Sequence, residues 1–216
     1  MSPRGEAGRG RERLSEESIL SSALALIDDE GLDAMSMRRL ASRLDVQPMA
    51  FYHHFPNKDA LLDRVADEVL ASVELPPLDL EWGEWTRRFF HGFKDAMLVH
   101  PNRVELMLAR PGTGADYANM FGAYVGTLTG AGADGALIHT SWHMLVSYLL
   151  GYLQQFHAAV RTFPRGRSLE GPARNLLRIA AQIEACDDDR EFDAGLDLIV
   201  QSIASRIRPT NSVVAG

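Results

Sequence analysis

A run of basic side chains lies between residues 34 and 58, where four cations stand against one carboxylate, Asp45. Arginine and lysine side chains grouped in this way bind phosphate. Because salt screening limits each charge to a reach of about 10 Å, such a patch acts locally even in a chain whose net charge is −7. Charge alone leaves open whether the patch is a binding surface or a solvated face. The four cations are Arg38, Arg39, Arg43 and Lys58.

His139 and His143 stand four residues apart, which places both imidazoles on one face of a helix. Such a pair could share a metal ion, but no glutamate follows His139 and no third ligand is evident, so the spacing is a weak indication. We interpret the two histidines as hydrogen-bonded and unmetallated, at a core or subunit boundary. Cys186 is the single cysteine, which excludes an internal disulfide and a CxxC pair. We predict neither a metal nor a cofactor.

The composition, 46% hydrophobic and 24% charged over 216 residues, is that of a folded chain with one large or two small domains. No apolar run reaches the roughly 18 residues that a membrane span needs. The first 13 residues are basic and lead into no apolar segment, so they do not resemble a secretory signal. We therefore expect a cytoplasmic protein without a membrane partner.

Apolar residues recur at helical spacing along almost the whole chain, and strand-like alternation is nearly absent, so we predict an all-α fold. Ser15, Ser36 and Asn57 are the expected helix N-caps, and Pro48 suits the first turn of a helix. Pro76 and Pro77 form the best internal boundary. The expected helices are 15–30, 36–44, 49–54, 57–74, 81–100, 102–109, 114–130, 134–160, 169–185 and 189–207.

This pattern predicts an N-terminal three-helix domain and a larger C-terminal helical bundle. Their expected limits are a flexible basic arm at 1–14, a small domain at 15–60, a linking helix at 58–75, a larger domain at 76–208 and a disordered tail at 209–216.

The short helices on either side of Asp45 fit a helix-turn-helix, in which small Ala41 allows the helices to cross closely and apolar Val46 fills the turn. The second helix of such a motif, here from Pro48 to Phe55, enters the major groove of DNA. Short helix pairs with exposed arginines also occur in other bundles, so spacing alone leaves this interpretation open.

The segment 19–58 resembles the DNA-binding domain of TetR-type transcriptional regulators. The resemblance rests on AMSMRRLA at 34–41, FYHHF at 51–55 and NKDALL at 57–62. The C-terminal part is similar, more loosely, to the tetracycline-repressor subgroup, at 106–111 and 147–151.

The resemblance implies that Ser36, Tyr52 and Lys58 contact phosphates, which set the register of a protein on DNA without reading its sequence. Arg38 matches a position that reaches a guanine edge. His53 points outward beside Tyr52. The apolar groups at the start of the second helix would contact thymine methyl groups or exclude wrong bases. These base-facing residues are Pro48, Met49 and Ala50.

The resemblance also implies a homodimer, in which helices 134–160 and 189–207 of both subunits form a four-helix bundle. An unusually large monomeric core is the alternative. The residues that we expect at the dimer interface are Leu145, Leu149, Leu153, Phe156, Leu196, Ile199 and Ile203.

An effector cavity between the middle helices follows from the same resemblance, lined by apolar groups with a few polar ones. The histidines that bind drug and metal in the tetracycline repressor have no counterpart here, so we do not expect tetracycline with magnesium. The expected effector-binding residues are Phe89, Phe93, Met97, Met107, Arg110, Tyr117, His143 and Gln154.

The expected function is that of a ligand-responsive, homodimeric repressor, which a small apolar or aromatic effector releases from a palindromic double-stranded operator. It is not an enzyme. The alternatives are a constitutive DNA-binding regulator without an effector and a helical-bundle metalloenzyme that uses His139 and His143.

Lys58→Ala should weaken binding to every DNA sequence and lower the slope of log affinity against log salt by about one, because one phosphate contact is lost. Titrations at several salt concentrations measure both effects. An unchanged slope would remove Lys58 from the phosphate contacts.

Overall fold

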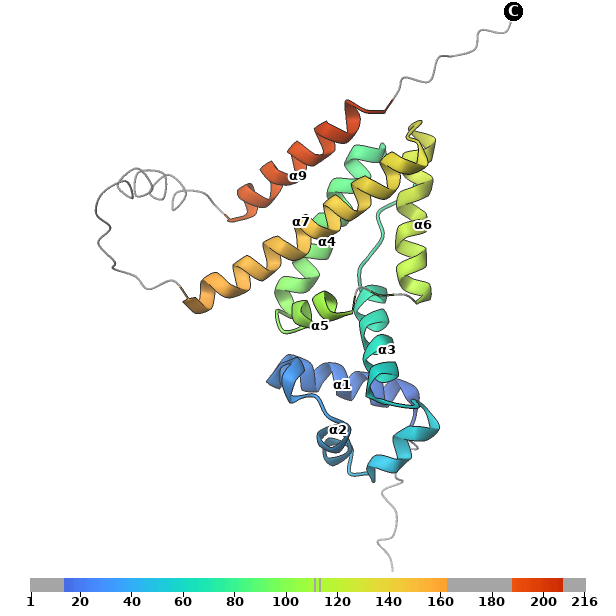
Figure 1. Ribbon diagram of the computed structural model, residues 1–216, viewed down its shortest axis with the longest axis vertical. Helices are drawn as coiled ribbons and strands as arrows, with labels where there is room; N and C mark the ends of the chain where they lie inside the picture. Colours follow the sequence, from blue (N-terminus) through green and yellow to red (C-terminus); the bar gives the residue numbers. More distant parts are fainter. Residues whose placement is uncertain (1–13, 111, 113, 163–187, 208–216) are drawn as a thin grey trace, which may run out of the picture.

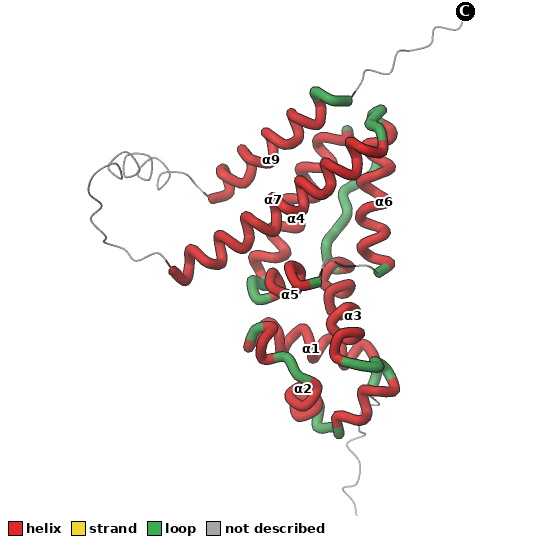
Figure 2. Tube along the Cα trace, in the orientation of Figure 1, coloured by secondary structure: helices red, strands yellow, loops and turns green. Residues whose placement is uncertain are grey.

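The computed structural model of the chain describes residues 14–110, 112, 114–162 and 188–207. Nearly all of the predicted arm at 1–14, the helix at 169–185 and the tail at 209–216 lie outside these residues. Within them the fold is all-α, as predicted, and contains no strand (Figures 1 and 2). The elements are α1 (Glu16–Glu30), the 3₁₀ helix η1 (Leu32–Ala34), α2 (Met37–Arg43), the 3₁₀ helix η2 (Pro48–His53), α3 (Lys58–Ala71), α4 (Trp82–Val99), α5 (Arg103–Ala109), α6 (Ala115–Gly130), α7 (Gly135–Thr162) and α9 (Asp188–Ala204).

The predicted N-caps are confirmed. Ser15 forms a capping box with Ser18, and its hydroxyl accepts a hydrogen bond from the backbone N–H of Ser18 at 3.1 Å. Ser36 caps α2 by accepting from the N–H of Arg39, and Asn57 caps α3 in the same manner. Each cap satisfies an N–H that has no partner inside its helix, so the starts of all three helices are local properties of the sequence.

Two predicted helices differ in the structure. The segment expected as a helix over 49–54 is the 3₁₀ helix η2, closed by bonds such as the 2.9 Å contact from Ala50 N–H to Gln47 C=O. It cannot lengthen into an α-helix because Pro56 disfavours the helical conformation at the residue before it and lacks an N–H. The helix expected to reach residue 75 ends at Ala71, where the Ser72 hydroxyl donates to the Val69 carbonyl at 2.6 Å.

We call residues 14–71 the head and residues 82–162 with α9 the body. The head lies at one end of the molecule, α9 at the other, and α3 rises from the head to the body (Figure 1). Helix α3 packs against α1 in the head and against α5 and α6 in the body. Its buried side chains therefore belong to both parts, including Leu61, Val65 and Val69, none of which is exposed.

The core of the body is a group of rings from α4, α6 and α7, which we call the aromatic cluster. Trp142 lies at its centre, with its ring centroid 5.2 Å from Tyr124, 5.4 Å from Phe121 and 6.2 Å from Phe89. Offset and edge-on ring contacts of this kind stabilise a core beyond the area that they bury. The cluster consists of Phe89, Phe90, Phe93, Tyr117, Phe121, Tyr124 and Trp142.

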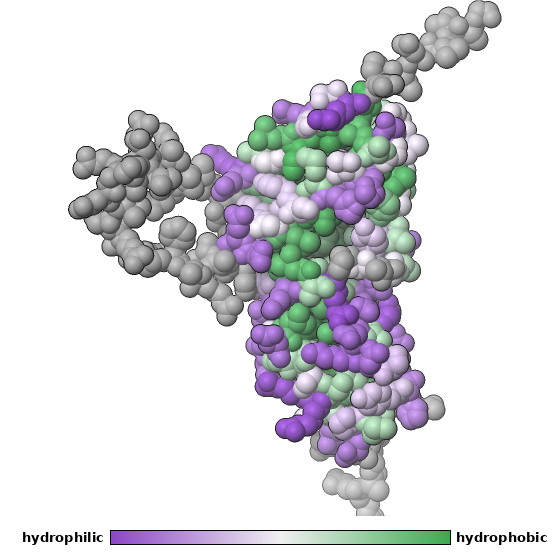
Figure 3. All heavy atoms as spheres, in the orientation of Figure 1, coloured by the Kyte–Doolittle hydropathy of each residue, from purple (hydrophilic) through white to green (hydrophobic). Residues whose placement is uncertain are grey.

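Helix α9 packs across α7 and α4. Phe192 is fully buried, and its ring stacks on Tyr148 at 5.4 Å between centroids. The Tyr148 hydroxyl donates to the Phe192 carbonyl at 3.1 Å, and Arg87 pairs with Asp197 at 2.6 Å. In the space-filling view, apolar and polar residues mix over the part of the surface formed by α7 and α9 (Figure 3). Within the described ranges, no helix combines the length and hydropathy needed to cross a bilayer.

Gly195→Ala should destabilise the protein, because a Cβ at this position would lie 2.1 Å from the Tyr148 hydroxyl oxygen. Overpacking of this kind costs roughly 1–3 kcal/mol. Gly126→Ala is the matched control, since a Cβ there meets nothing within 4 Å, and its higher helix propensity should raise stability by about 0.5–1 kcal/mol. Thermal or denaturant unfolding measures both variants. Equal stabilities of the Gly195→Ala and Gly126→Ala variants would show that α9 does not pack closely on Tyr148.

Candidate nucleic-acid interface and effector region

The turn between α2 and η2 is tight. Asp45 has φ 51, in the left-handed region that a short polar side chain tolerates, and the N–H of Val46 donates to the Ala41 carbonyl at 3.0 Å. Ala41 is 1% exposed and Phe51 is not exposed at all. A small residue at the crossing and a buried aromatic anchor fix η2 across α2, as the helix-turn-helix interpretation requires.

The residues predicted to bind DNA all lie on this unit and on the first turn of α3. The side chains of Tyr52, His53 and Lys58 are exposed, and Met49 is 71% exposed, so all four are accessible to a partner. Half-exposed residues complete the set. They are Ser36, Pro48 and Ala50.

The arginines of α2 divide into two kinds. Arg39 pairs with Glu30, and Arg43 pairs with Asp29 at 2.7 Å, so both guanidinium groups are held by the acidic end of α1. Arg38 and Lys58 are exposed and form no ion pair with any other described residue. The structure thus leaves available the two cations that the resemblance assigns to DNA, and it shows why Arg39 and Arg43 are less suited to that role.

Two helix N-termini lie beside these cations. Free N–H groups and the positive end of the helix dipole favour an anion there. The Ser36 oxygen already accepts from Arg39 N–H at 3.2 Å, which leaves its hydroxyl proton to donate to a phosphate. Asn57 caps α3 directly before Lys58 and orients that first turn. Sequence analysis identified Asn57 as a cap but did not include it in the site.

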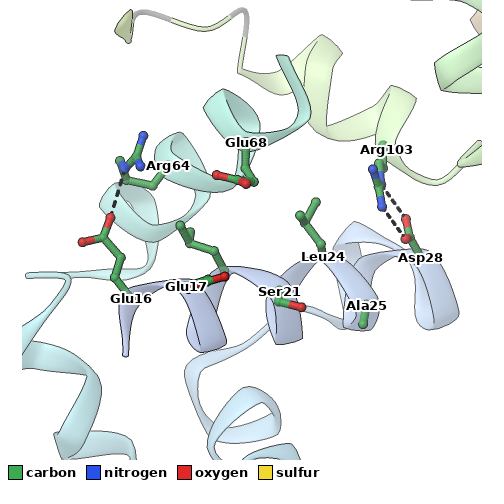
Figure 4. A pocket seen from close by; sticks show the side chains of 10 residues that line it. Glu16, Glu17, Ser21, Leu24, Ala25, Asp28, Arg64, Glu68 and Arg103 are labelled. Atoms are coloured by element: carbon green, nitrogen blue, oxygen red, sulfur yellow. Dashed lines mark hydrogen bonds and ion pairs between the residues drawn. The ribbon is translucent and has the colours of Figure 1, made fainter. Parts of the chain in front are cut away.

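The head is held against the body by Asp28 at the end of α1. Arg103, at the start of α5, donates two hydrogen bonds to its carboxylate at 2.8 and 2.7 Å, and His100 Nδ1 lies 3.1 Å from it. Asn102 donates to the Asp28 backbone carbonyl at 2.8 Å. Figure 4 shows this contact at one end of a cleft of about 670 Å³ between α1 and α3, with the Glu16–Arg64 pair at the other end.

Arg110, expected to bind effector, instead contacts α3. Its guanidinium donates to Asp63 at 2.6 Å and also pairs with Asp59. The hydrogen bond that Arg110 donates to Asp63 is the largest cause that raises the pKa of Arg110, against the lowering effect of its partial burial. We therefore correct its expected role: Arg110 joins the end of α5 to the first turns of α3 and lies outside the aromatic cluster.

A second link between head and body joins α3 to the start of α6. The Asp67 carboxylate is buried, and a Cβ at Gly114 would lie 1.8 Å from its Oδ2, so only glycine fits beside it. Asp67 Oδ1 has no hydrogen-bond partner among the described residues. The carboxylate lies beside the start of α6, where the positive end of the helix dipole offsets part of the cost of burial, and its Oδ2 is 3.5 Å from Arg64 Nη1.

Several predicted effector-binding residues lie in or near the aromatic cluster. Phe89 and Phe93 contact each other at 6.0 Å between centroids, and Tyr117 accepts a hydrogen bond from Trp142 Nε1 at 3.1 Å. Met97 and Met107 are buried in the same hydrophobic core.

The structure adds Trp142 and Tyr124, which sequence analysis did not include in the site. Trp142 touches rings on α4 and α6. The Tyr124 hydroxyl contacts Ser141 Oγ at 2.6 Å. Burial raises the pKa of Tyr124 to about 12, so this hydroxyl stays protonated at neutral pH and serves only as a hydrogen-bonding group.

Two polar candidates lie away from this region. Gln154 is exposed and lines a cleft beside α1 and α5. His143 is exposed on α7, where its Nε2 lies 3.1 Å from that of His139. The resemblance implied that both side chains face the effector cavity, but in the structure they are exposed on α7. Among the described residues, no group of three metal-ligating side chains occurs.

All four predicted interface leucines are buried within one protomer. Leu145 and Leu149 have no exposed surface, so they belong to the core of this chain and leave the interface to other residues of α7 and α9. The side chain of Phe156 lies outside the described set. On the outer face, Met144 is 46% and Leu198 is 69% exposed. The other buried members of the predicted set are Leu153, Leu196 and Ile203, whereas Ile199 is half-buried.

This geometry defines an all-α protein with a helix-turn-helix head on a larger helical body, and known proteins share both parts. Residues 19–65 match the family model described as "Bacterial regulatory proteins, tetR family". The tetracycline repressor class A of transposon 1721, from Escherichia coli, is 31% identical over 205 residues, which cover 90% of this chain and 92% of that protein.

Solved structures are similar over the same length. The TetR family protein ActR of Streptomyces coelicolor, in complex with actinorhodin, has a TM-score of 0.76 at 26% identity and covers 92% of this chain and 99% of its own. BioQ with its double-stranded DNA operator has a TM-score of 0.69 at 27% identity, over 89% and 99% of the two chains. BioQ has also been solved from Mycobacterium smegmatis.

The chain belongs to the TetR family. It is therefore a DNA-binding transcriptional regulator and not an enzyme, which removes the metalloenzyme alternative.

Arg38→Ala should weaken binding to a selected operator by about 1–3 kcal/mol and relax the preference at one base pair, because its guanidinium is free to reach a base. Arg39→Ala is the matched control: it removes the same charge from the next position, but that charge is paired with Glu30. Anisotropy titrations on the operator and on single-base variants measure both. Equal losses of affinity and selectivity would contradict the division between these two arginines.

Proposed function

We propose that the protein is a homodimeric repressor that a small apolar or aromatic effector releases from a palindromic operator. The observation that carries the proposal is the direct attachment of α3 to both parts: it forms the core of the reading head and also touches α5 and α6 of the body. A change in the body therefore reaches the head through one helix. The proposed functional limits are 15–60 for DNA binding and 76–208 for effector binding and dimerisation, in a cytoplasmic protein.

A homodimer follows from what one head can read. A helix-turn-helix contacts half of a site, and two heads must stand about 34–36 Å apart to read both halves of a palindrome. The outer face of α7 and α9, which carries exposed Met144 and Leu198, is the surface that we assign to the second subunit. A two-fold interface uses the same patch on both copies, so one apolar face suffices.

The aromatic cluster is the proposed effector region. It joins α4, α6 and α7 through Phe89, Tyr117 and Trp142, and its few polar groups are the hydroxyls of Tyr117 and Tyr124 and the indole N–H. Such a lining suits a flat, mostly apolar molecule with a few hydrogen-bonding groups. The complex of ActR with actinorhodin supports a ligand of this kind.

The path to DNA runs through two contacts, one at the start of α6 and one at the end of α5. Asp67 lies against Gly114, and Arg110 holds Asp59 and Asp63, so α6 and the end of α5 both touch α3. An effector that separates the rings of α6 and α7 shifts α6, tilts α3 and changes the spacing of the two heads. A coupling of about 1–3 kcal/mol changes occupancy of the operator 5- to 150-fold.

Operator fragments selected from random duplexes provide the test. Compounds that raise the melting temperature of the protein should also lower its operator affinity and quench Trp142 fluorescence, because they bind against that ring. A constitutive regulator would show no compound that changes operator affinity. Spin labels on the two heads should report a changed separation at saturating effector, and release of DNA at a fixed separation would contradict the tilting mechanism.

Arg110→Gln should reduce the effector's influence on operator affinity at least about fivefold, the lower end of an ordinary allosteric coupling. Binding of the effector itself should change little, because Arg110 lies outside the aromatic cluster. Arg88→Gln, which removes the same charge and an ion pair with Glu84 within α4, away from α3, is the control. Effector affinity and operator affinity are measured separately. An undiminished coupling in Arg110→Gln would exclude this contact from the path.

A further inference from the structure

The pair His139 and His143 is not used by the proposed function. Both side chains are exposed on α7, their ring centroids are 4.4 Å apart, and their Nε2 atoms converge to 3.1 Å. A hydrogen bond between two imidazoles requires one ring nitrogen to donate and the other to accept. A cation that replaces this hydrogen bond would be held between the two converging Nε2 atoms.

The separation of the two nitrogens fits a tetrahedral metal ion. Zinc bonds to histidine nitrogen at about 2.0–2.1 Å, and two ligands at the tetrahedral angle then lie about 3.3–3.4 Å apart. The observed 3.1 Å differs from this by a few tenths of an ångström, within the reach of small side-chain rotations. Imidazole suits zinc, nickel and copper rather than magnesium or calcium, which prefer oxygen ligands.

One protomer cannot complete such a site. Among the described residues, no third histidine, cysteine or carboxylate joins the pair. The groove beside it is formed by groups that are weak or poor zinc ligands, including Thr140, Met144 and Ile199. Two protein ligands alone hold an ion loosely, so stable binding needs ligands from outside this chain.

The position of the pair indicates where those ligands come from. His139, His143 and Met144 lie with Ile199 around one groove between α7 and α9, on the face that we assign to the dimer. In a two-fold interface the same patch of each copy faces the other, so histidines of this face approach groups of the second copy.

We propose that His139 and His143, together with ligands from a second copy of this chain, form a site for a zinc-like transition-metal ion. This inference rests on the homodimer of the proposed function. Binding such an ion across the interface stabilises the dimer, because an ion held by both copies binds the dimer more tightly than the monomer.

Untagged protein should bind Zn²⁺ in calorimetric titrations, and His139→Gln and His143→Gln should each weaken that binding by roughly tenfold or more, since even changes outside the ligand shell cost 10–100-fold. His54→Gln, which removes an exposed histidine from the head, is the control for background binding. Circular dichroism checks that each variant folds. Equal zinc affinity in wild type and His143→Gln would overturn the inference.

Sedimentation at low protein concentration tests the contribution of the second copy. Zn²⁺ should lower the dimer dissociation constant of wild type at least about tenfold relative to EDTA and leave that of His139→Gln unchanged. If zinc binds through the pair without strengthening the dimer, the inference is overturned, but the proposed homodimer is not contradicted. A chain that is monomeric in EDTA and dimeric only with zinc would contradict the metal-independent homodimer while supporting this site.

Discussion

The structure depends on one helix that packs in two domains at once. Helix α3 buries Leu61 and Val65 in the head, and farther along it brings Asp67 and Leu70 against the link between α5 and α6. Because protein interiors are close-packed, a helix held on both sides moves as a rigid body and carries its neighbours with it. The orientation of the head relative to the body is therefore set by the contacts that α3 makes where it enters the body.

The charged side chains at the junction of head and body form ion pairs, whereas Arg38 on the head does not pair with any described residue. Arginines at the junction hold carboxylates, as Arg103 holds Asp28 and Arg110 holds Asp59 and Asp63. Partly exposed ion pairs contribute little to stability, typically below about 1 kcal/mol each. Their directional, multiple hydrogen bonds are better suited to fixing orientation. Arg38, which pairs with no carboxylate among the described residues, is exposed on the head of a chain that is acidic overall.

The helix-turn-helix and most helix limits were predictable because they depend on neighbours in the sequence. A cap such as Ser36 needs only the N–H three residues on, and Phe51 and Phe55 are buried whatever the body does. The same local reasoning missed the 3₁₀ form of η2, where Pro56 limits the helix. It also could not place Arg110, whose partners lie about fifty residues earlier in the chain.

The amino-acid sequence by itself determined the all-α class, the helix-turn-helix head and the group of cations on that head, since these follow from periodicity, caps and local charge. Only the tertiary structure decided which face of each long helix points inward. An apolar stripe on α7 fits a core or an interface equally well, and Leu145 and Leu149 lie in the core because other helices of the body pack against α7. Rotating a helix changes the neighbours of every side chain at once, and that rotation is set by packing between distant segments.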